Sequence, residues 1–271
     1  MPAPNEITVL QLNRLIGTPE CPQIIDICTD ADFHEDPFLI PGSVRHPYTD
    51  IPGLIARVQG QPSVIVCQKG LKLSQGVAAW LRSDGLKAEY LQGGMYGWRD
   101  APDTHRVPCT VLPDRVAGQT LWVSRHRPKI DRIACPWLIR RFVDPSARFL
   151  FVSPGEVTGV AQRMGATPFD IEGVFWSHRG DLCTFDTMLS EFQLCTPALS
   201  RMADVIRAAD TNRHDQHPAA AGLLAMSVGL SRQYRDDTAQ LKAGLVLYDA
   251  LYRWARDGYD ETHDWPNAQG G

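Results

Sequence analysis

The sequence has no excess of basic charge and no long apolar run, and each absence excludes a class of protein. It contains 27 Lys and Arg against 31 Asp and Glu, a formal net charge of -4, whereas proteins that rely on nucleic-acid phosphates are usually basic. No apolar run approaches the roughly 18 residues of a membrane span. Residues 1–15 show no basic stretch followed by an apolar core, as a secretory signal would. We therefore expect no nucleic-acid or membrane partner.

The sequence also lacks a disulfide framework. Its seven cysteines are an odd number, and their spacings match no known pattern of paired bridges. Without an export signal, this predicts reduced thiols in a cytoplasmic protein. The length of 271 residues allows two domains that each bury a core of their own.

Short apolar runs alternate with helical stretches over the first hundred residues. The runs at 24–28 and 63–67 are rich in Ile and Val, which is typical of strands that are buried on both faces of a parallel sheet. A helical face of apolar residues follows Cys67, and Gly85 lies where a helix C-cap belongs. Residues 88–91 predict another strand, and a helical turn is expected before Trp98. This order predicts an open α/β fold.

Cys67 ends one of these strands and precedes a short loop that opens a helix. At the C-terminal ends of parallel strands, loop N–H groups and a helix N-terminus favour an anion, which lowers the pKa of a thiol and stabilises a thiolate. The loop has two cations and a glycine that lets it curl around the sulfur. The spacing alone leaves open that Cys67 is an inert buried residue. The residues that would bind the substrate are Gln68, Lys69, Gly70, Leu71 and Lys72.

Four motifs, in the right order over about residues 6–100, resemble the rhodanese family. They are the Cys-x-x-Gly loop at 67–70, the helix that follows it, the segment Leu-Gln-Gly-Gly-Met-Tyr-Gly-Trp at 91–98, and Ile-Pro-Gly-Ser at 40–43. Asp26 matches the Asp at a strand end of the family. The resemblance implies a persulfide on Cys67 and transfer of sulfane sulfur from an anionic donor, such as thiosulfate, to a thiol or cyanide-like acceptor. It implies no cofactor for this domain.

Two positions depart from the rhodanese pattern. Cys28 stands where an Arg usually follows the strand, and Gln68 stands where an Arg often follows the nucleophile. The loss of both arginines is expected to weaken turnover on thiosulfate, and a non-catalytic rhodanese fold used for binding stays an alternative. If the strands of Cys28 and Cys67 are neighbours, Cys28 is either a second thiol at the same sheet edge or a small residue that fills the core.

The pattern of predicted strands and helices changes after the first domain. Several prolines break the pattern between 99 and 120. Strands are expected at 121–123, 148–152 and 174–177, a helix is expected to start at Pro136 and end near Val143, and further helices are expected at 154–164, 184–192, 197–210, 218–234 and 236–257. We predict a rhodanese-like domain with an open parallel sheet at 1–110, a linker at 111–120, and a mainly helical α+β domain at 121–271.

Three polar clusters stand out in the second half. An arginine-rich segment at 125–141 is a candidate oxyanion site, because guanidinium groups bind oxyanions through paired hydrogen bonds. A solvated basic face with a buried cysteine is the alternative. The candidate residues are Arg125, Asp131, Arg132 and Cys135.

The other two clusters, at 177–186 and 209–217, offer nitrogen, sulfur and oxygen donors that could form one mixed metal site. Asp210 ends a predicted helix, where a negative charge is unfavourable unless a cation stabilises it. The alternative is that these side chains only cap helices. The candidate ligands are His178, Cys183, Asp186 and Asp210.

Residues 121–125, 128–142, 177–186 and 209–211, with the tail at 221–252, resemble the C-terminal domain of ChrB-type chromate-resistance proteins. The match covers about 120–257 and implies a role in the response to chromate. The resulting hypothesis is a sulfurtransferase that works through a Cys67 persulfide and is coupled to chromate resistance or sensing. The alternative is a non-catalytic sensor or regulator that uses the rhodanese fold as an interaction module.

Overall fold

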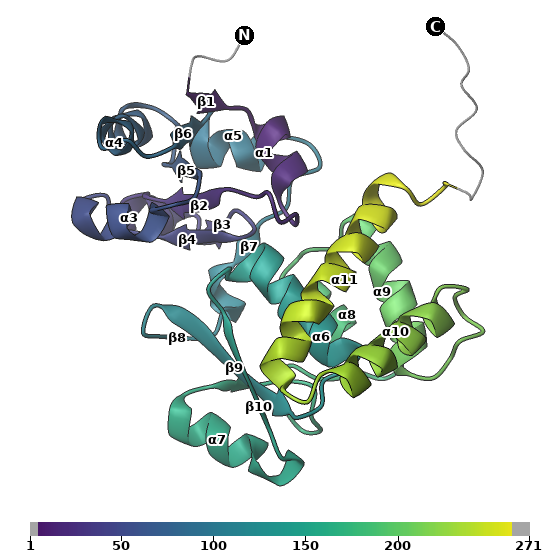
Figure 1. Ribbon diagram of the computed structural model, residues 1–271. Coiled ribbons are helices and arrows are strands. Elements are labelled where there is room, and N and C mark those ends of the chain that lie inside the picture. Colours follow the sequence, from purple (N-terminus) through teal and green to yellow (C-terminus); the bar gives the residue numbers. More distant parts are fainter. Residues whose placement is uncertain (1–4, 262–271) are drawn as a thin grey trace, which may run out of the picture.

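The computed structural model describes residues 5–261, so the outermost residues of both predicted domains lie outside the described part. The chain forms two α/β regions, one above the other in Figure 1. None of the helices in 5–261 is long and apolar enough to cross a bilayer.

The first region is built on a five-stranded parallel sheet in the order β1-β6-β5-β2-β4. The central strand β5 is buried along its whole length, which agrees with the apolar run that predicted it. The predicted open parallel sheet is therefore confirmed. Its strands are β1 (Glu6–Ile7), β2 (Gln23–Asp26), β4 (Ser43–Arg45), β5 (Ser63–Val66) and β6 (Ala88–Leu91), while β3 (Phe38–Leu39) pairs with β7 (Val107–Pro108) outside the sheet.

Helices cover both faces of this sheet. Leu54 of α3 and Leu81 of α4 pack with Ile65 on one face, whereas Leu12 of α1 and Trp98 of α5 pack with Val64 and other residues on the other. Figure 1 shows the two pairs of helices on opposite sides of the strands. The helices are α1 (Val9–Leu15), α2 (Asp30–Glu35), α3 (Ile51–Val58), α4 (Lys72–Ser83) and α5 (Gly94–Asp100).

The second region combines a small sheet with a helical bundle. Strand β9 (Gln119–Arg125) lies between the parallel strands β10 (Arg148–Val152) and β11 (Thr167–Pro168), and β8 (Arg115–Val116) pairs with it antiparallel. Helix α7 covers one face, and the bundle covers the other. The mainly helical α+β prediction is confirmed. The helices are α6 (Asp131–Leu138), α7 (Val157–Met164), α8 (Thr184–Glu191), α9 (Pro197–Asp210), α10 (Ala220–Gln233) and α11 (Asp237–Asp257), with 3-10 turns at Cys109–Val111 and Pro154–Glu156.

Three local predictions need correction. Pro136 does not start a helix, because α6 already begins at Asp131 and the chain then forms a π-helical turn, Ile139–Val143. Residues 174–177 form no strand apart from an isolated bridge at Trp176. The segment is apolar because the Trp176 ring packs against Trp122 and Phe192 in the core. The segment assigned as a linker, 111–120, contains β8 and the first two residues of β9.

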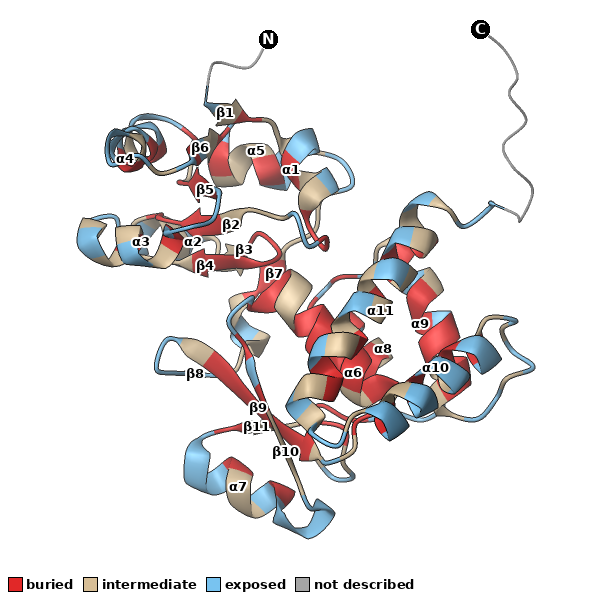
Figure 2. Ribbon diagram, in the orientation of Figure 1, coloured by how far each residue is buried: buried red, intermediate tan, exposed pale blue. Residues whose placement is uncertain are grey.

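The two regions share one apolar cluster, and Figure 2 shows buried ribbon in both regions close to β7, where they meet. Phe142 and Tyr252 of the second region close over Gly17 of the first, where an added Cβ would lie 2.4 Å from the Phe142 ring. The N–H of Gly42 donates to the Phe142 carbonyl at 2.6 Å. Arg256 donates to the Arg14 carbonyl at 3.0 Å. The regions are therefore packed against each other and not merely tethered.

Candidate functional sites at Cys67 and around His178

Cys67 lies directly after β5, at the C-terminal edge of the first sheet. Its side chain is buried, and Sγ donates a hydrogen bond to the Ser74 hydroxyl at 3.1 Å. Ser74 itself is fully buried in the first turn of α4 and donates to the Leu71 carbonyl at 3.2 Å. A hydroxyl can equally donate to a thiolate, so Ser74 is a functional candidate that the sequence analysis did not single out.

The backbone between Cys67 and α4 leaves its donors free. Within the described residues, none of the N–H groups of 68–74 donates a hydrogen bond to another protein group, and the start of α4 has no side-chain cap. Unpaired N–H groups at a helix N-terminus carry partial positive charge and bind anions. The loop therefore provides donors for an anionic sulfur or an anionic substrate.

Two glycines hold the loop in place by close backbone packing. The N–H of Met95 donates to the Cys67 carbonyl at 3.0 Å. A Cβ on Gly94 would lie only 2.1 Å from that carbonyl oxygen, and a Cβ on Gly70 would lie 2.5 Å from the Gly94 nitrogen. Both glycines have positive φ, +67° at Gly70 and +57° at Gly94. The Leu-x-Gly-Gly segment thus holds the nucleophile loop in place through backbone contacts.

A cavity of about 830 Å³ opens over the sulfur. Lys69 and Lys72 line it and are exposed, so their charges face a solvent-accessible space. Gln68, Leu71, Asp32 and Tyr48 also line it. All the predicted substrate-binding residues except Gly70 therefore line one cavity together with Cys67.

Cys28 and Asp26 lie beside this cavity. Strand β2 is the neighbour of β5, which brings Cys28 to the same sheet edge as Cys67. Asp26 is buried and accepts a hydrogen bond from the Cys28 N–H at 2.8 Å. Burial, followed by the charge of Asp26, raises the pKa of the Cys28 thiol far above its usual value, so Cys28 is protonated at neutral pH.

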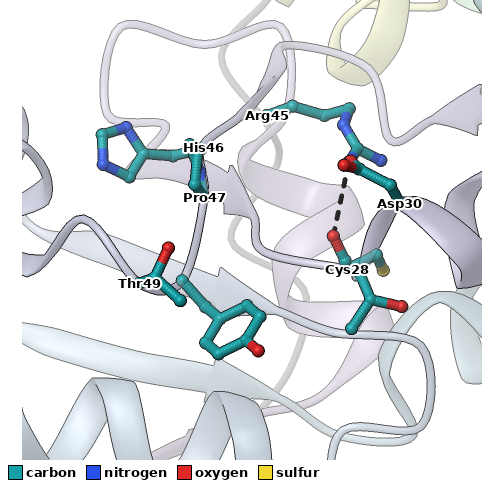
Figure 3. Close-up of a pocket in the computed structure, with 8 residues that line it drawn as sticks. Cys28, Asp30, Arg45, His46, Pro47 and Thr49 are labelled. Atoms are coloured by element: carbon teal, nitrogen blue, oxygen red, sulfur yellow. Dashed lines mark hydrogen bonds and ion pairs between the residues drawn. The ribbon is translucent and has the colours of Figure 1, made fainter.

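A second cavity, of about 320 Å³, is lined by Cys28 and Arg45 and shares Tyr48 with the first. Figure 3 shows Arg45 reaching across to Asp30 and to the Cys28 carbonyl. The Arg45 guanidinium lies 2.8 Å from Asp30 and donates to that carbonyl at 3.4 Å. Arg45 therefore supplies an arginine close to the position where Cys28 replaces the usual one.

In the second region, three carboxylates meet around one imidazole. His178 Nε2 lies 3.3 Å from Asp170 Oδ1, 3.3 Å from Asp210 Oδ2 and 3.6 Å from Asp131 Oδ2. Asp131 begins α6, Asp170 follows β11, His178 precedes α8 and Asp210 ends α9. We call these four residues the carboxylate–histidine cluster.

Asp131 is the most deeply placed member, with 0% of its surface exposed. Its Oδ2 accepts a hydrogen bond from the Thr184 N–H at 2.6 Å, and its Oδ1 accepts one from the Phe185 N–H at 3.0 Å. The carboxylate therefore lies at the N-terminus of α8. Burial, with the nearby charges of Asp210 and Asp170, raises the pKa of Asp131 well above its usual value.

Asp170 connects the predicted oxyanion residues to the predicted metal ligands. Its Oδ2 lies 3.1 Å from an Arg125 nitrogen and 3.2 Å from Arg132 Nε. Burial favours a higher pKa for Asp170, but hydrogen bonding to His178 and the charges of both arginines hold that pKa below its usual value. Hydrogen bonds to Asp170 and then Asp210 raise the pKa of His178 to about 10.

The remaining candidates take other roles. Asp186 accepts a hydrogen bond from the Cys183 N–H at 3.0 Å and forms an ion pair with Arg207 at 2.6 Å, so it caps α8. Cys183 and Cys135 are fully buried, and burial raises the pKa of both thiols far above the usual value. Among the described residues, the carboxylates within 4 Å of His178 Nε2 are those of the cluster.

The cluster borders a cavity of about 460 Å³, lined in part by Arg125, Asp170, Ser177 and His178. Asp170 was missed by the sequence analysis, although an acid flanked by Phe169 and Ile171 is a signal of a buried carboxylate. The arrangement concentrates negative oxygen ligands around one nitrogen ligand, which suits a cation more than an anion.

The topology and the Cys67 loop define the first region as a rhodanese-like α/β domain. Solved structures similar to the chain include a rhodanese-like domain protein from Staphylococcus aureus, 27% identical, covering 36% of this chain and 95% of that one, with a TM-score of 0.32. They also include a thiosulfate sulfurtransferase from Pseudomonas aeruginosa, 20% identical, covering 41% of this chain and 21% of that one, with a TM-score of 0.33.

Residues 122–255 match the family model described as ChrB, C-terminal domain. Protein ChrB of Cupriavidus metallidurans is 33% identical over 138 aligned positions, and the alignment covers 48% of this chain and 39% of that protein. The match thus spans about two fifths of the length of that relative. The predicted likeness of the second half to the ChrB C-terminal domain is confirmed, and the first half has the open parallel sheet that the rhodanese resemblance implies.

Proposed function

We propose that the chain is a sulfurtransferase that carries sulfane sulfur as a persulfide on Cys67. The observation that carries this proposal is the set of unpaired N–H groups at 68–74 around a buried thiol at the end of β5. A domain used only for binding needs neither the thiol nor free donors beside it. The two exposed lysines at the cavity favour an anionic donor such as thiosulfate.

The reaction has two transfers. The Cys67 thiolate attacks the sulfane sulfur of thiosulfate, the S–S bond of thiosulfate breaks, and sulfite leaves with the electron pair. A thiolate or cyanide then attacks the outer sulfur of the persulfide and restores the Cys67 thiolate. The N–H groups of the loop and the Ser74 hydroxyl stabilise the anionic sulfur in both states.

We infer that the second domain links this chemistry to chromate or a similar oxyanion. The family match and the resemblance to chromate-resistance proteins support this role. Arg125, on the wall of the cavity beside the cluster, is the group we propose to meet the oxyanion. Arg132 takes part less directly, because it also donates to the backbone carbonyls of Arg125 and His126.

Intact-protein mass spectrometry tests the persulfide. After incubation with thiosulfate, the full chain should gain one sulfur atom that cyanide removes, and Cys67→Ser should not gain it. Cys195→Ser is the matched control, because Cys195 is a free and exposed cysteine far from β5 in the sequence; this variant should label fully. No adduct in the wild type would favour the non-catalytic sensor, and an adduct that persists in Cys67→Ser would assign the sulfur to another cysteine.

A further inference from the structure

The carboxylate–histidine cluster has the spacing of ligands that share one ion. One ligand atom each from Asp131, Asp170 and His178 lies within 4.8 Å of the others, and Nε2 is 3.3–3.6 Å from three carboxylate oxygens. Ligand atoms about 2.1 Å from a metal, at angles of 90–110°, lie about 3.0–3.4 Å apart. The observed separations are close to that range and longer than an ideal N–H···O hydrogen bond of about 2.9 Å.

A buried polar group without a partner lies on the same side of the sheet. Ser124 is 0% exposed, and its hydroxyl makes no hydrogen bond with a described residue. Ser124 lies two residues after Trp122 in β9, so both side chains point to the same face. Trp122 packs there against Phe169 and Trp176, which lead directly into Asp170 and the His178 loop. The Ser124 side chain therefore lies on the face of β9 that carries the segments of the cluster, where a metal-bound water would satisfy its hydroxyl.

The cluster is also accessible from solvent. The side chain of His178 is 40% exposed, and the cavity of about 460 Å³ reaches both His178 and Asp170. Asp131 is fully buried, and the α8 N-terminus holds its carboxylate in place. An ion could therefore enter from the cavity, meet ligands on the inner side, and keep an exchangeable position toward the solvent.

We propose that Asp131, Asp170, His178 and Asp210 form a binding site for one divalent cation with a preference for oxygen ligands, such as Mn²⁺. Three carboxylates and one imidazole make a mostly hard donor set, which fits Mn²⁺ better than a soft, thiolate-seeking ion. The Cys135 thiol donates to Asp131 Oδ1 at 3.5 Å and Cys183 is the N-cap residue of α8, but neither thiol is among the proposed ligands. The site is independent of Cys67 and of the sulfur chemistry.

Titration of the full-length protein with Mn²⁺, followed by the electron paramagnetic resonance signal of free Mn²⁺, tests the site. The wild type should bind one Mn²⁺ per chain. His178→Gln and Asp210→Asn should each weaken binding at least about 100-fold, the upper end of what is typical for a group that only supports a ligand. Both residues are partly exposed, so these variants should fold, and circular dichroism checks that they do.

Asp186→Asn is the matched control. Asp186 lies in the same region and also carries a carboxylate, but its oxygens are held by Arg207 and by the Cys183 N–H. This variant should bind Mn²⁺ within about twofold of the wild type. No Mn²⁺ binding by the wild type, or an equal loss in Asp186→Asn and Asp210→Asn, would overturn the proposal and identify the cluster as an ion-pair network alone.

Discussion

The Cys67 loop and the carboxylate–histidine cluster attract ligands of opposite charge and are built in opposite ways. The loop is one continuous segment whose free N–H groups and lysines favour an anion, supported by a second segment at 91–98. The cluster takes one residue from each of four separate segments between 131 and 210 and gathers negative charge. The first site therefore depends on backbone shape, and the second depends on tertiary packing that forces like charges together.

This contrast predicts which substitutions damage each site most. A backbone-shaped site should fail when a methyl group is added at a glycine, although no charge changes. A site of converging side chains should fail when one carboxylate is removed, although the backbone keeps its shape.

Gly94→Ala should give the largest effect. The added Cβ would lie 2.1 Å from the Cys67 carbonyl oxygen and 2.3 Å from the Gly70 nitrogen, so the nucleophile loop must shift. We expect a loss of about 3 kcal/mol or more in the free energy of unfolding and no persulfide on Cys67. Urea denaturation and mass spectrometry after thiosulfate treatment measure the two effects.

Gly60→Ala is the control for this clash. Gly60 has a φ of +81°, also left-handed, but nothing lies within 4 Å of its added Cβ. It should cost only the strain of a left-handed alanine, about 1 kcal/mol, and leave the persulfide intact. Equal losses in the two variants would show that the conformation, and not the contact with the loop, makes Gly94 necessary.

Asp131→Ala should give the next largest effect. It leaves the N–H groups of Thr184 and Phe185 buried without an acceptor, and we expect a loss of about 2 kcal/mol in unfolding free energy. Asp181→Ala, which removes an exposed carboxylate paired with Arg213, should change little. Thermal or urea unfolding at neutral pH compares them. A more stable Asp131→Ala would mean that repulsion from Asp170 and Asp210 outweighs the two hydrogen bonds.

Tyr248→Phe should have a moderate effect. The Tyr248 hydroxyl is buried and donates at 2.9 Å to the carbonyl of Ile130, the residue before Asp131. Ile130 has a φ of +41°. Losing this bond should cost about 1 kcal/mol and weaken Mn²⁺ binding only a few-fold. Tyr234→Phe is the control, because the Tyr234 hydroxyl makes no hydrogen bond with a described residue. If the two variants unfold alike, Tyr248 does not hold the start of α6.

Lys69→Gln combined with Lys72→Gln should have the smallest effect. Both side chains are exposed at the cavity, so they attract thiosulfate through a screened field. KM for thiosulfate should rise a few-fold at low salt with little change in kcat, and the difference from wild type should shrink as salt is added. Lys87→Gln removes an exposed lysine at a different cavity and should leave KM unchanged. A change confined to kcat would assign the lysines to sulfur transfer instead.

The contrast between the two sites also explains what the sequence could predict. The strand at 63–66 is buried along its whole length and the strand at 88–91 is buried at both ends. The helix that follows Cys67 has its period and its Gly85 cap in one continuous stretch, so local patterns were sufficient. The glycine contacts between 70 and 94 agree with motifs that the sequence shows directly. The helices α9 and α11 were also predicted almost residue by residue from their amphipathic pattern.

The cluster could be predicted only in part. His178 and Asp210 do lie together, but Asp186 caps α8, because an acid at the third position of a helix has a local partner that competes with any distant ligand set. Asp170 follows a two-residue strand without a recognisable motif. The early start of α6 depends on Ile130 and Tyr248, which are 118 residues apart in the chain. Contacts of this kind are set by packing and leave no periodic signal.

The packing of Phe142 and Tyr252 over Gly17 has a consequence for the whole molecule. Since the apolar cluster runs through both regions, neither can melt without exposing the surface that the other covers. Calorimetry should therefore record a single cooperative endotherm for the full chain. A cation that binds only to the native cluster would then raise the melting temperature of the sheet that holds Cys67 as well. Occupancy of a site in the ChrB-like half would thus set the thermal stability of the sulfur-handling half.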